Sequence, residues 1–272
     1  TEHWIKNFDI DGWRMDVAKE LDFSFWKDFR DIAYSAKKDI LLISEIFGDT
    51  SQWLQGERFD GTMNYSFRET MTDYFATKRI DNKEFANSLS NLYSMYSFEA
   101  LSSCQNLLSS HDVKRFLNRC GTNTNGMFGA VFLQATFPGI AGIYYGDEIG
   151  LGGADDPHNR EPFPWESEDK WNKDLLMFTS SLMNIKTSNP ILRYGNFEMA
   201  TYDDNYVIFR RVLNDVSLLC IVNRDLNDTD IELNTNAHSV EIIYGDCTIE
   251  LDSGKLKIKD LAENFGLIIK ES

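Results

Sequence analysis

Short apolar runs alternate with amphipathic stretches over the first two thirds of the chain, up to about residue 192. The runs have the length of buried strands, and the stretches between them carry apolar residues at helical spacing. One such helix is expected to follow Asp22, whose carboxylate suits the N-cap position. Strands that alternate with helices are typical of βα units and a parallel sheet. The expected strands are Phe8–Met15, Asp39–Phe47, Phe59–Tyr65, Cys104–Ser109 and Ile140–Tyr145.

After about Leu192 the pattern changes to short strand-like runs that are separated by turn residues. The segment Asp252–Gly254 lies between two of these runs and predicts a hairpin turn. We therefore predict an α/β domain over residues 1–192 and a small antiparallel β-sandwich domain over residues 193–272. Strands of the second domain are expected at Tyr206–Val212, Val216–Val222, Val240–Tyr244, Thr248–Leu251, Lys255–Ile258 and Phe265–Ile269.

The chain is strongly acidic, since 27 Lys and Arg residues against 43 Asp and Glu residues give a net charge of −16. Such a charge repels nucleic acids and anionic membranes, so we expect neither as a partner. No apolar run reaches the ~18 residues that span a bilayer, and the first residues do not have the regions of a signal peptide. The cysteines Cys104, Cys120, Cys220 and Cys247 have no CxxC spacing, which predicts buried thiols in a reducing compartment. We expect a cytoplasmic protein.

Three carboxylates lie just past apolar runs, where core packing gives no reason for them. Asp16 and Glu45 each end a predicted strand, and Asp112 follows a third. Barrels of parallel strands hold catalytic residues at such ends. Two carboxylates, one a nucleophile and one a proton donor, are what retaining glycoside hydrolysis requires. Arg14 points to the same strand face as Asp16 and would keep that carboxylate ionised. Taken alone, Asp112 has the alternative role of a helix N-cap, and its neighbour His111 that of a core imidazole.

Several motifs around these residues resemble conserved regions of the α-amylase family of glycoside hydrolases. They are GWRMDVAKE at 12–20, SEIFGD at 44–49, LLSSHDVKRF at 107–116, PGIAGIYYGDEIGLGG at 138–153 and DDPHNREPFPW at 155–165. Their order and separation fit strands four, five, seven and eight of that family's barrel and the loop that follows. Together with FDGTMNYSF at 59–67, they are most similar to the cyclomaltodextrinase, neopullulanase and maltogenic amylase group.

The resemblance implies a retaining α-glucan hydrolase that cuts α-1,4 bonds of maltooligosaccharides, cyclodextrins or pullulan by double displacement. Asp16 would be the nucleophile and Glu45 the general acid and then base. Asp112 and His111 would bind hydroxyls of the distorted sugar. The resemblance also implies substrate-binding positions at Arg14, Asp156, Arg160, Asn64, Lys19 and Glu20.

The chain also departs from the family pattern. Phe47 stands where relatives usually have Trp, and Gly48 where they often have His, so we expect an aromatic contact to an acceptor sugar to be retained and a polar one to be lost. Tyr144 and Tyr145 are interpreted as packing residues of the barrel floor. The first three strands of the barrel are not recognisable, nor is the DxxxNH region of strand three, which in many relatives contributes calcium contacts.

We therefore expect a partial TIM (β/α)8 barrel, about strands four to eight, followed by the β domain. We expect no metal site and no required cofactor within this chain, with calcium a feature of a full-length enzyme. Partners would be the α-glucan substrate and either a second copy of the chain or a complementing N-terminal segment. Two alternatives stay open: a transglycosylase that uses the same triad, and a non-catalytic carbohydrate-binding or structural fragment that cannot complete the barrel.

Overall fold

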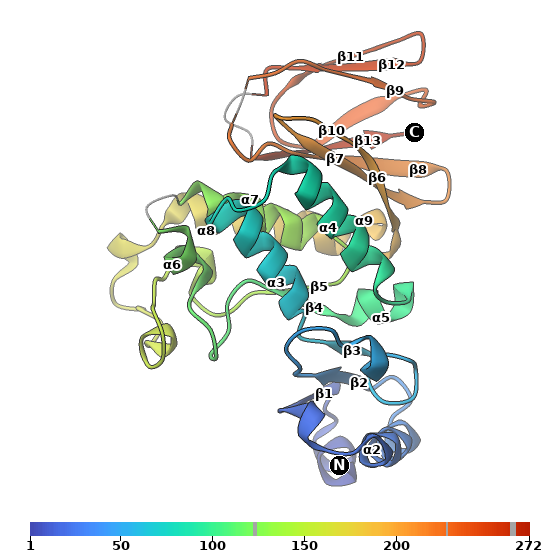
Figure 1. Cartoon of the computed structure of the whole chain (residues 1–272), viewed down its shortest axis with the longest axis vertical. Helices are drawn as coiled ribbons and strands as arrows, with labels where there is room; N and C mark the ends of the chain where they lie inside the picture. The colour runs from blue at the N-terminus through green and yellow to red at the C-terminus, as the bar shows by residue number, and fades with distance from the viewer. Residues whose placement is uncertain (122–123, 227, 262–264) are drawn as a thin grey trace.

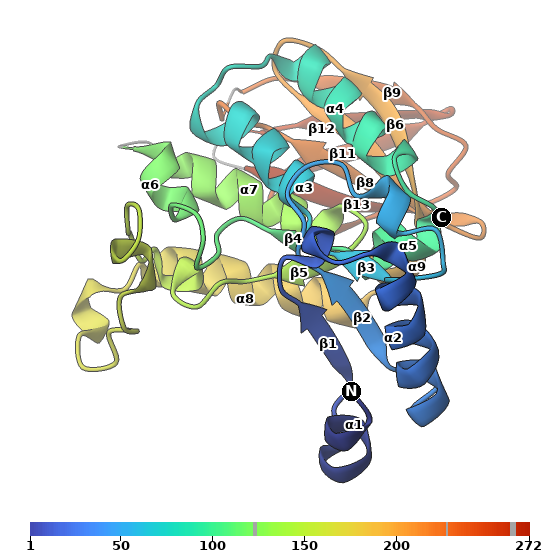
Figure 2. The ribbon, with the colours of Figure 1, turned by 60° about the horizontal axis from the view of Figure 1, so that its bottom comes forward.

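The computed structural model describes residues 1–121, 124–226, 228–261 and 265–272. A β-sandwich forms one end of the molecule, a layer of helices lies beneath it, and the first strands with helices α1 (Glu2–Phe8) and α2 (Phe23–Ala36) form the other end (Figures 1 and 2). The further α-helices are α3 (Tyr65–Met71), α4 (Asn82–Ser94), α5 (Phe98–Ser103), α6 (Phe116–Cys120), α7 (Asn125–Thr136), α8 (Lys173–Ser188) and α9 (Pro190–Tyr194).

The parallel strands lie in the order in which they occur along the chain. Strands β1 (Gly12–Met15), β2 (Leu41–Ser44) and β3 (Gly61–Thr62) form one parallel sheet, and β4 (Gln105–Leu107) pairs in parallel with β5 (Ile140–Gly142). A parallel bridge between Met63 and Gln105 joins the two sheets. The predicted βα units and parallel pairing are therefore present, although each strand is shorter than its apolar run.

The start of the first predicted strand is helical instead. Phe8 ends α1, and Asp9 terminates this helix in the left-handed conformation (φ 49°), with its N–H donated to the carbonyl of Ile5. Helix α2 begins as predicted, because the Asp22 carboxylate accepts a hydrogen bond from the backbone N–H of Ser24 at 2.8 Å. The apolar residues of this helix are unevenly buried, since Phe25 is 48% exposed while Trp26 is 2% exposed.

The C-terminal part is a sandwich of two antiparallel sheets. One sheet has the strand order β10-β13-β8-β7-β6 and the other β11-β12-β9. The predicted hairpin is present, and Ser253 and Gly254 at its tip have the positive φ angles of 49° and 80° that a tight hairpin turn uses. Strands β6 and β9 were not predicted. The strand bounds are β6 (Asn196–Tyr202), β7 (Val207–Leu213), β8 (Val216–Val222), β9 (Ile231–Asn234), β10 (Val240–Tyr244), β11 (Thr248–Asp252), β12 (Lys255–Lys259) and β13 (Gly266–Glu271).

The larger sheet is apolar on both faces, because strand residues alternate between two cores. Ile208 faces the smaller sheet in one core, while the next residue, Phe209, belongs to the core shared with the helices. Phe197 links that shared core across the junction, with its ring 5.2 Å from Phe209 and 5.3 Å from Phe137, which follows α7. The sandwich and the helical layer therefore share one continuous hydrophobic core.

No helix among the described residues combines the length and the apolar character that crossing a membrane would need.

Candidate active site

The ends of β1 and β2 bring two of the predicted carboxylates side by side. Met15 is the register partner of Ser44, and the next residue in each chain segment is a carboxylate, Asp16 and Glu45. The backbone N–H of Glu45 donates to the carbonyl of Met15 at 2.9 Å, which continues the pairing. The two residues therefore lie at the same edge of the sheet, as the sequence pattern predicts.

Arg14 lies between these carboxylates and contacts both. Its Nη1 donates to Asp16 Oδ1 at 2.7 Å, and its Nη2 donates to Glu45 Oε1. Because Arg14 precedes Asp16 by two residues, both side chains share one face of β1. One guanidinium thus orients both carboxylates.

The environments of the two carboxylates move their pKa values in opposite directions. The hydrogen bond from Arg14 holds the pKa of Asp16 below its ordinary value, and this side chain is 73% exposed. Burial raises the pKa of Glu45, whose side chain is only 5% exposed. A carboxyl group with a lowered pKa beside one with a raised pKa is the arrangement that nucleophile and acid roles require.

Backbone groups after β1 also hold Glu45, which the sequence did not indicate. The N–H of Val17 donates to Glu45 Oε2 at 3.2 Å, and the N–H of Ala18 to the Glu45 carbonyl at 3.3 Å. Val17 has a φ of 44°, a left-handed conformation that a β-branched residue rarely adopts. A backbone angle has no signature in one sequence, so this contact could not be predicted.

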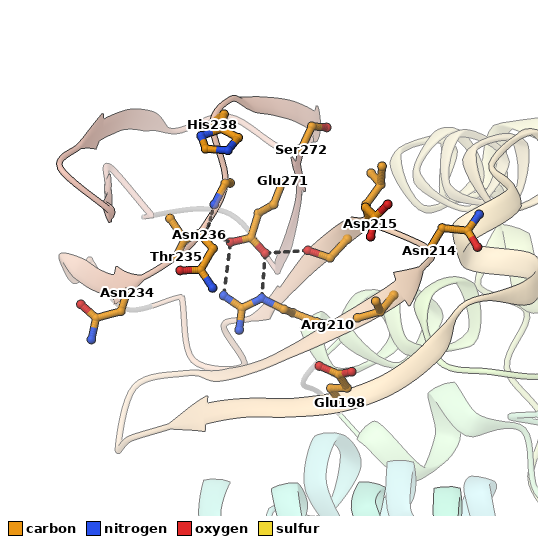
Figure 3. A pocket seen from close by; sticks show the side chains of 14 residues that line it. Glu198, Arg210, Asn214, Asp215, Asn234, Thr235, Asn236, His238, Glu271 and Ser272 are labelled. Atoms are coloured by element: carbon orange, nitrogen blue, oxygen red, sulfur yellow. Dashed lines mark hydrogen bonds and ion pairs between the residues drawn. The ribbon is translucent and has the colours of Figure 1, made fainter.

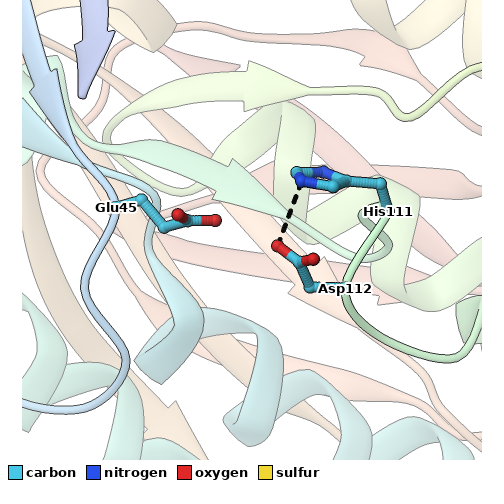
Figure 4. Close-up of side chains that lie close together, drawn as sticks. All are labelled: Glu45, His111 and Asp112. Carbon is cyan, nitrogen blue, oxygen red and sulfur yellow. Dashed lines mark ion pairs between the residues drawn. The ribbon is translucent and has the colours of Figure 1, made fainter. Parts of the chain in front are cut away.

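The turn after β4 supplies the third carboxylate and its histidine. His111 Nε2 lies 3.1 Å from Asp112 Oδ2. Figure 4 shows both side chains directed toward Glu45, and ligand atoms of the three residues lie within 4.8 Å of one another. The structure therefore brings Asp16, Glu45, Asp112 and His111 together at one edge of the parallel strands.

The segment after β5 brings a second guanidinium to this cluster. Arg160 Nη2 lies 3.6 Å from Asp112 Oδ1, and Arg160 Nε lies 3.2 Å from Asp156 Oδ1. The sequence predicted Asp156 and Arg160 as substrate-binding residues, and the structure places Arg160 beside Asp112.

A cleft of about 300 Å³ opens beside these residues. Phe47 forms part of its wall, is 52% exposed and stacks on Tyr65 with 3.8 Å between ring centroids. Aromatic rings backed in this way offer a flat apolar surface. The lining residues are Asp16, Val17, Lys19, Glu45, Ile46, Phe47 and Asp112.

The remaining predicted substrate-binding residues, Lys19, Glu20 and Asn64, do not all lie on the cleft. Lys19 lines the cleft, whereas Glu20 is exposed and is not among the lining residues. Asn64 is 1% exposed, and its side chain is used within the fold. Its Oδ1 accepts from the N–H of Phe67 to cap α3, and its Nδ2 donates to Asn106 at 2.9 Å. Asn64 therefore has an internal hydrogen-bonding role, not a place on the cleft surface.

Glu45, His111 and Asp112 also have the donor atoms that a divalent cation uses. The surrounding charges argue against this role, because Arg14 is paired with Glu45 and Arg160 lies beside Asp112. Bringing a cation among these groups would mean displacing or opposing two guanidinium charges. The arrangement is better suited to proton transfer and to hydrogen bonding of hydroxyl groups.

Tyr144 and Tyr145 lie against a buried cation, and Tyr145 is 39% exposed, so this residue does not have the packing role that the sequence predicted. The Arg115 guanidinium lies 4.6 Å and 4.9 Å from their ring centroids and donates to the Tyr145 carbonyl at 2.8 Å. Asp147 lies 3.3 Å from the same guanidinium, and burial raises its pKa to about 7.

A larger hollow of about 680 Å³ lies in the sandwich, away from every predicted site residue (Figure 3). At its floor Arg210 donates two hydrogen bonds to Glu271, whose carboxylate also accepts from Ser217 and Thr235. These groups satisfy one another, so the hollow is interpreted as the polar end of the sandwich core.

Comparison with known proteins identifies the family. The family model described as "Alpha amylase, catalytic domain" matches residues 1–174, more than half of the chain. The chain belongs to the α-amylase family. The resemblance seen in the motifs is thereby confirmed, as is the similarity to the cyclomaltodextrinase and neopullulanase group.

Two relatives illustrate the similarity within the α-amylase family. The cyclomaltodextrinase of Thermoanaerobacter pseudethanolicus is 38% identical over 238 residues, which cover 86% of this chain and 41% of the relative. Neopullulanase 2 of Thermoactinomyces vulgaris is 40% identical over 216 residues, which cover 79% of this chain and 37% of the relative. The chain thus spans less than half the length of these curated relatives.

Solved structures agree with this α-amylase family assignment. A cyclomaltodextrinase structure superposes with a TM-score of 0.89 at 30% identity, over 100% of this chain and 47% of that one. A debranching enzyme of Nostoc punctiforme gives a TM-score of 0.89 at 28% identity, over 100% of this chain and 60% of that one. The neighbours combine TIM-barrel and C-terminal antiparallel sheet architecture, in agreement with the predicted barrel type and C-terminal β domain.

Proposed function

We propose that this protein is a retaining α-glucan hydrolase in which Asp16 is the nucleophile and Glu45 is the acid and base. The observation that supports this most directly is the pair of carboxylates on Arg14, since Asp16 has a lowered pKa and Glu45 a raised one. Such a difference matches the two roles of a double displacement.

The proposed reaction has two displacements at the anomeric carbon. Asp16 attacks that carbon and forms a glycosyl ester, while Glu45 gives its proton to the departing glycosidic oxygen. Glu45 then takes a proton from water, whose oxygen attacks the same carbon and releases Asp16. Two inversions leave the product in the α configuration of the substrate.

The remaining side chains of the cleft fit a sugar substrate. His111, Asp112 and Arg160 offer donors and acceptors to hydroxyl groups of the sugar that reacts, with Asp156 beside them. Phe47 offers an apolar ring face, and Lys19 and Glu20 lie on the acceptor side in this proposal. Relatives are named cyclomaltodextrinase, neopullulanase and maltogenic α-amylase, which supports an α-1,4-linked glucan, cyclodextrin or pullulan as substrate.

Transfer to a sugar acceptor is the second candidate reaction. The same glycosyl ester would form, and a sugar hydroxyl would replace water in the second displacement. The exposed ring of Phe47 favours this candidate, because an aromatic face beside the acid could bind an acceptor sugar. The ratio of transfer to hydrolysis products separates the two.

The five parallel strands are assigned in this proposal to strands four to eight of a (β/α)8 barrel. Within the described chain, β1 and β5 each pair with a strand on one side only. Apolar side chains are exposed near both, with Phe8 61% and Ile143 41% exposed. A complementing segment that carries the other three strands, or a second copy of the chain, would cover these edges. We expect little turnover until the barrel is completed.

The proposed chemistry uses carboxylates and guanidinium groups of this chain and needs no cofactor, while calcium binding is assigned to the strand-three region of a complete barrel. A cytoplasmic location also stays a proposal. It is supported by a relative from Bacillus subtilis that is named intracellular maltogenic amylase and is 38% identical over 82% of this chain.

The test uses β-cyclodextrin and maltotriose with the chain alone and with a segment that carries three further βα units. Proton NMR of the first products should show the α anomer, and Asp16→Asn should lose several orders of magnitude in rate. Asp39→Asn, an exposed carboxylate before β2, is the matched control and should keep the wild-type rate. First products in the β configuration would exclude the retaining assignment. Binding without turnover in the completed barrel would favour a carbohydrate-binding fragment.

A further inference from the structure

The catalytic turn after β4 has little backbone support of its own. Residues Ser110 and Val113 form a single isolated antiparallel bridge, with 3.5 Å between the Val113 nitrogen and the Ser110 oxygen. His111 and Asp112 lie between them, and the Asp112 N–H donates to Ser110 Oγ at 3.2 Å. The orientation of both side chains therefore depends on groups outside the turn.

Asn159 supplies several of these outside contacts from the 3-10 turn His158–Arg160, which follows β5. Its Nδ2 lies 2.8 Å from the carbonyl oxygen of His111, 3.1 Å from that of Val113 and 3.5 Å from that of Ser110. Asn159 is 1% exposed, and its two N–H groups give the carbonyls of His111 and Val113 the hydrogen bonds that water would otherwise give.

The neighbouring residue reinforces one of these contacts. Arg160 Nε also donates to the His111 carbonyl, at 2.9 Å. The His111 carbonyl oxygen thus accepts hydrogen bonds from two side chains that are adjacent in sequence. The Nη2 atom of Arg160 also lies 3.6 Å from Asp112 Oδ1.

The segment that carries Asn159 is itself fixed in place. The carbonyl of Gly153 accepts from the N–H of Arg115, which follows the catalytic turn, at 3.1 Å. A Cβ at Gly153 would lie 2.5 Å from the carbonyl oxygen of His158 and 2.9 Å from the Cα of Asn159, so only glycine fits this approach. The two segments therefore have one close-packed arrangement.

We propose that Asn159 is a positioning residue that holds the turn 110–113 so that His111 and Asp112 face Glu45. This inference rests on the proposed function, in which those two side chains bind the reacting sugar. Asn159 itself acts through the backbone of the turn and not through the substrate. Its sequence position between two predicted binding residues gave no signal of this role.

The test compares three substitutions that remove donors by different means. Asn159→Asp keeps the shape and removes both N–H groups, Asn159→Ala removes them without adding charge, and Asn159→Ser keeps one O–H donor. The control is Asn172→Ala, which removes the N-cap of α8 in the same part of the chain without touching the turn. A lost cap costs about 1 kcal/mol, so this control reports on lowered stability alone.

The first measurement is the ring signals of His111 in the histidine NMR spectrum of the chain. The sequence has 4 histidines, and the spectrum of His111→Gln assigns the signal. We expect a clear shift in Asn159→Asp and Asn159→Ala, a smaller one in Asn159→Ser and none in Asn172→Ala. This readout does not depend on turnover, so it separates failure of this inference from failure of the proposed function.

The second measurement is steady-state kinetics in the preparation that hydrolyses glucan. A displacement of about 1 Å costs roughly a hundredfold in rate, and we expect kcat to fall by about that factor in Asn159→Ala with a smaller change in KM. An unchanged His111 signal in folded Asn159→Ala would overturn the inference. Equal shifts in Asn172→Ala, or global unfolding of all three Asn159 variants, would also overturn it, since either result would mean a general role in stability.

Discussion

Arg14 determines the electrostatics of the candidate site, because it contacts both of the carboxylates that are proposed as catalytic. Its hydrogen bond is the largest cause of the lowered pKa of Asp16, and its charge also opposes the effect of burial on Glu45. At the scale of single residues, the proposed chemistry therefore depends on one guanidinium as well as on two carboxylates.

The first prediction concerns Arg14→Met, which keeps the length of the side chain and removes the charge. Both carboxylates would then have higher pKa values, since the guanidinium favours their ionised forms. Asp16 must be ionised and Glu45 protonated, so both limbs of the pH profile of kcat/KM should move to higher pH. The profile is measured in the complete barrel, with Lys6→Met as an exposed control that should leave both limbs in place. Movement of one limb only, or movement to lower pH, would contradict the shared role of Arg14.

The acidic residues of the site could be predicted from the sequence, whereas the residues that hold them in position could not. Asp16, Glu45 and Asp112 were predicted because a carboxylate after an apolar run has no packing role. The contacts of Val17 and Asn159 were not predicted, because they depend on a left-handed backbone angle and on a turn remote in sequence. Asn64 was predicted to bind substrate because of the motif in which it lies, but its side chain is buried and caps helix α3.

At the scale of elements, helix α7 ends on buried cations instead of on solvent. Lys186 of α8 donates to the carbonyls of Ala135 and Phe137 at 3.1 and 3.3 Å, and Arg211 of β7 donates to that of Thr136. Cations near a helix C-terminus are stabilised by its unpaired carbonyls. These two residues join α7 to α8 and to the sandwich.

The second prediction follows from the burial of Lys186, which lowers its pKa from 10.5 to about 7, with the charge of Arg211 adding to the effect. Above about pH 7 the folded state has released this proton while the unfolded state still holds it. The free energy of unfolding should therefore rise with pH from this group, by up to about 1.4 kcal/mol per pH unit. Denaturant unfolding of wild type and of Lys186→Met between about pH 7 and pH 9 measures this rise as the difference between their free energies of unfolding. The contributions of other titrating groups cancel in that difference. A constant difference between the two proteins would contradict the lowered pKa of Lys186 in the folded state.

Element types were predicted well and their bounds less well. The bounds of β8 and β10 are those predicted, because these strands are apolar runs between clear turn residues. The first strand was predicted to begin before β1 does, because the aromatic residues of α1 continue the apolar pattern into β1. Strand β6 was not predicted, because its pattern of polar and apolar residues is weak.

At the scale of the whole molecule, the helical layer and the sandwich form one hydrophobic core. Phe209 of the sandwich is 0% exposed, belongs to this shared core and lies against Phe197, which in turn contacts Phe137. We therefore expect the two parts to unfold together, and the main role of the β domain to be stability.

The third prediction tests this coupling through the position of the tryptophans. All 6 tryptophans lie between residues 4 and 171, outside the sandwich. Phe209→Ala should cost about 3–5 kcal/mol and should lower the denaturation midpoint seen by tryptophan fluorescence. Glu241→Ala, at an exposed position of the same sheet, is the control and should leave the midpoint in place. An unchanged tryptophan midpoint in Phe209→Ala would mean that the sandwich unfolds independently.

The role of Asp16 as the nucleophile is tested most directly by trapping the glycosyl ester with a fluorinated α-glucosyl fluoride, whose second displacement is slow. Trypsin separates Asp16 in the peptide Met15–Lys19 from Glu45 in the peptide Asp39–Arg58. In the preparation that hydrolyses glucan, mass spectrometry should find one fluoroglucosyl group on Met15–Lys19 and none in Asp16→Asn. A label on Asp39–Arg58, or rapid hydrolysis through which no labelled peptide ever accumulates, would contradict the assignment of Asp16 as the nucleophile.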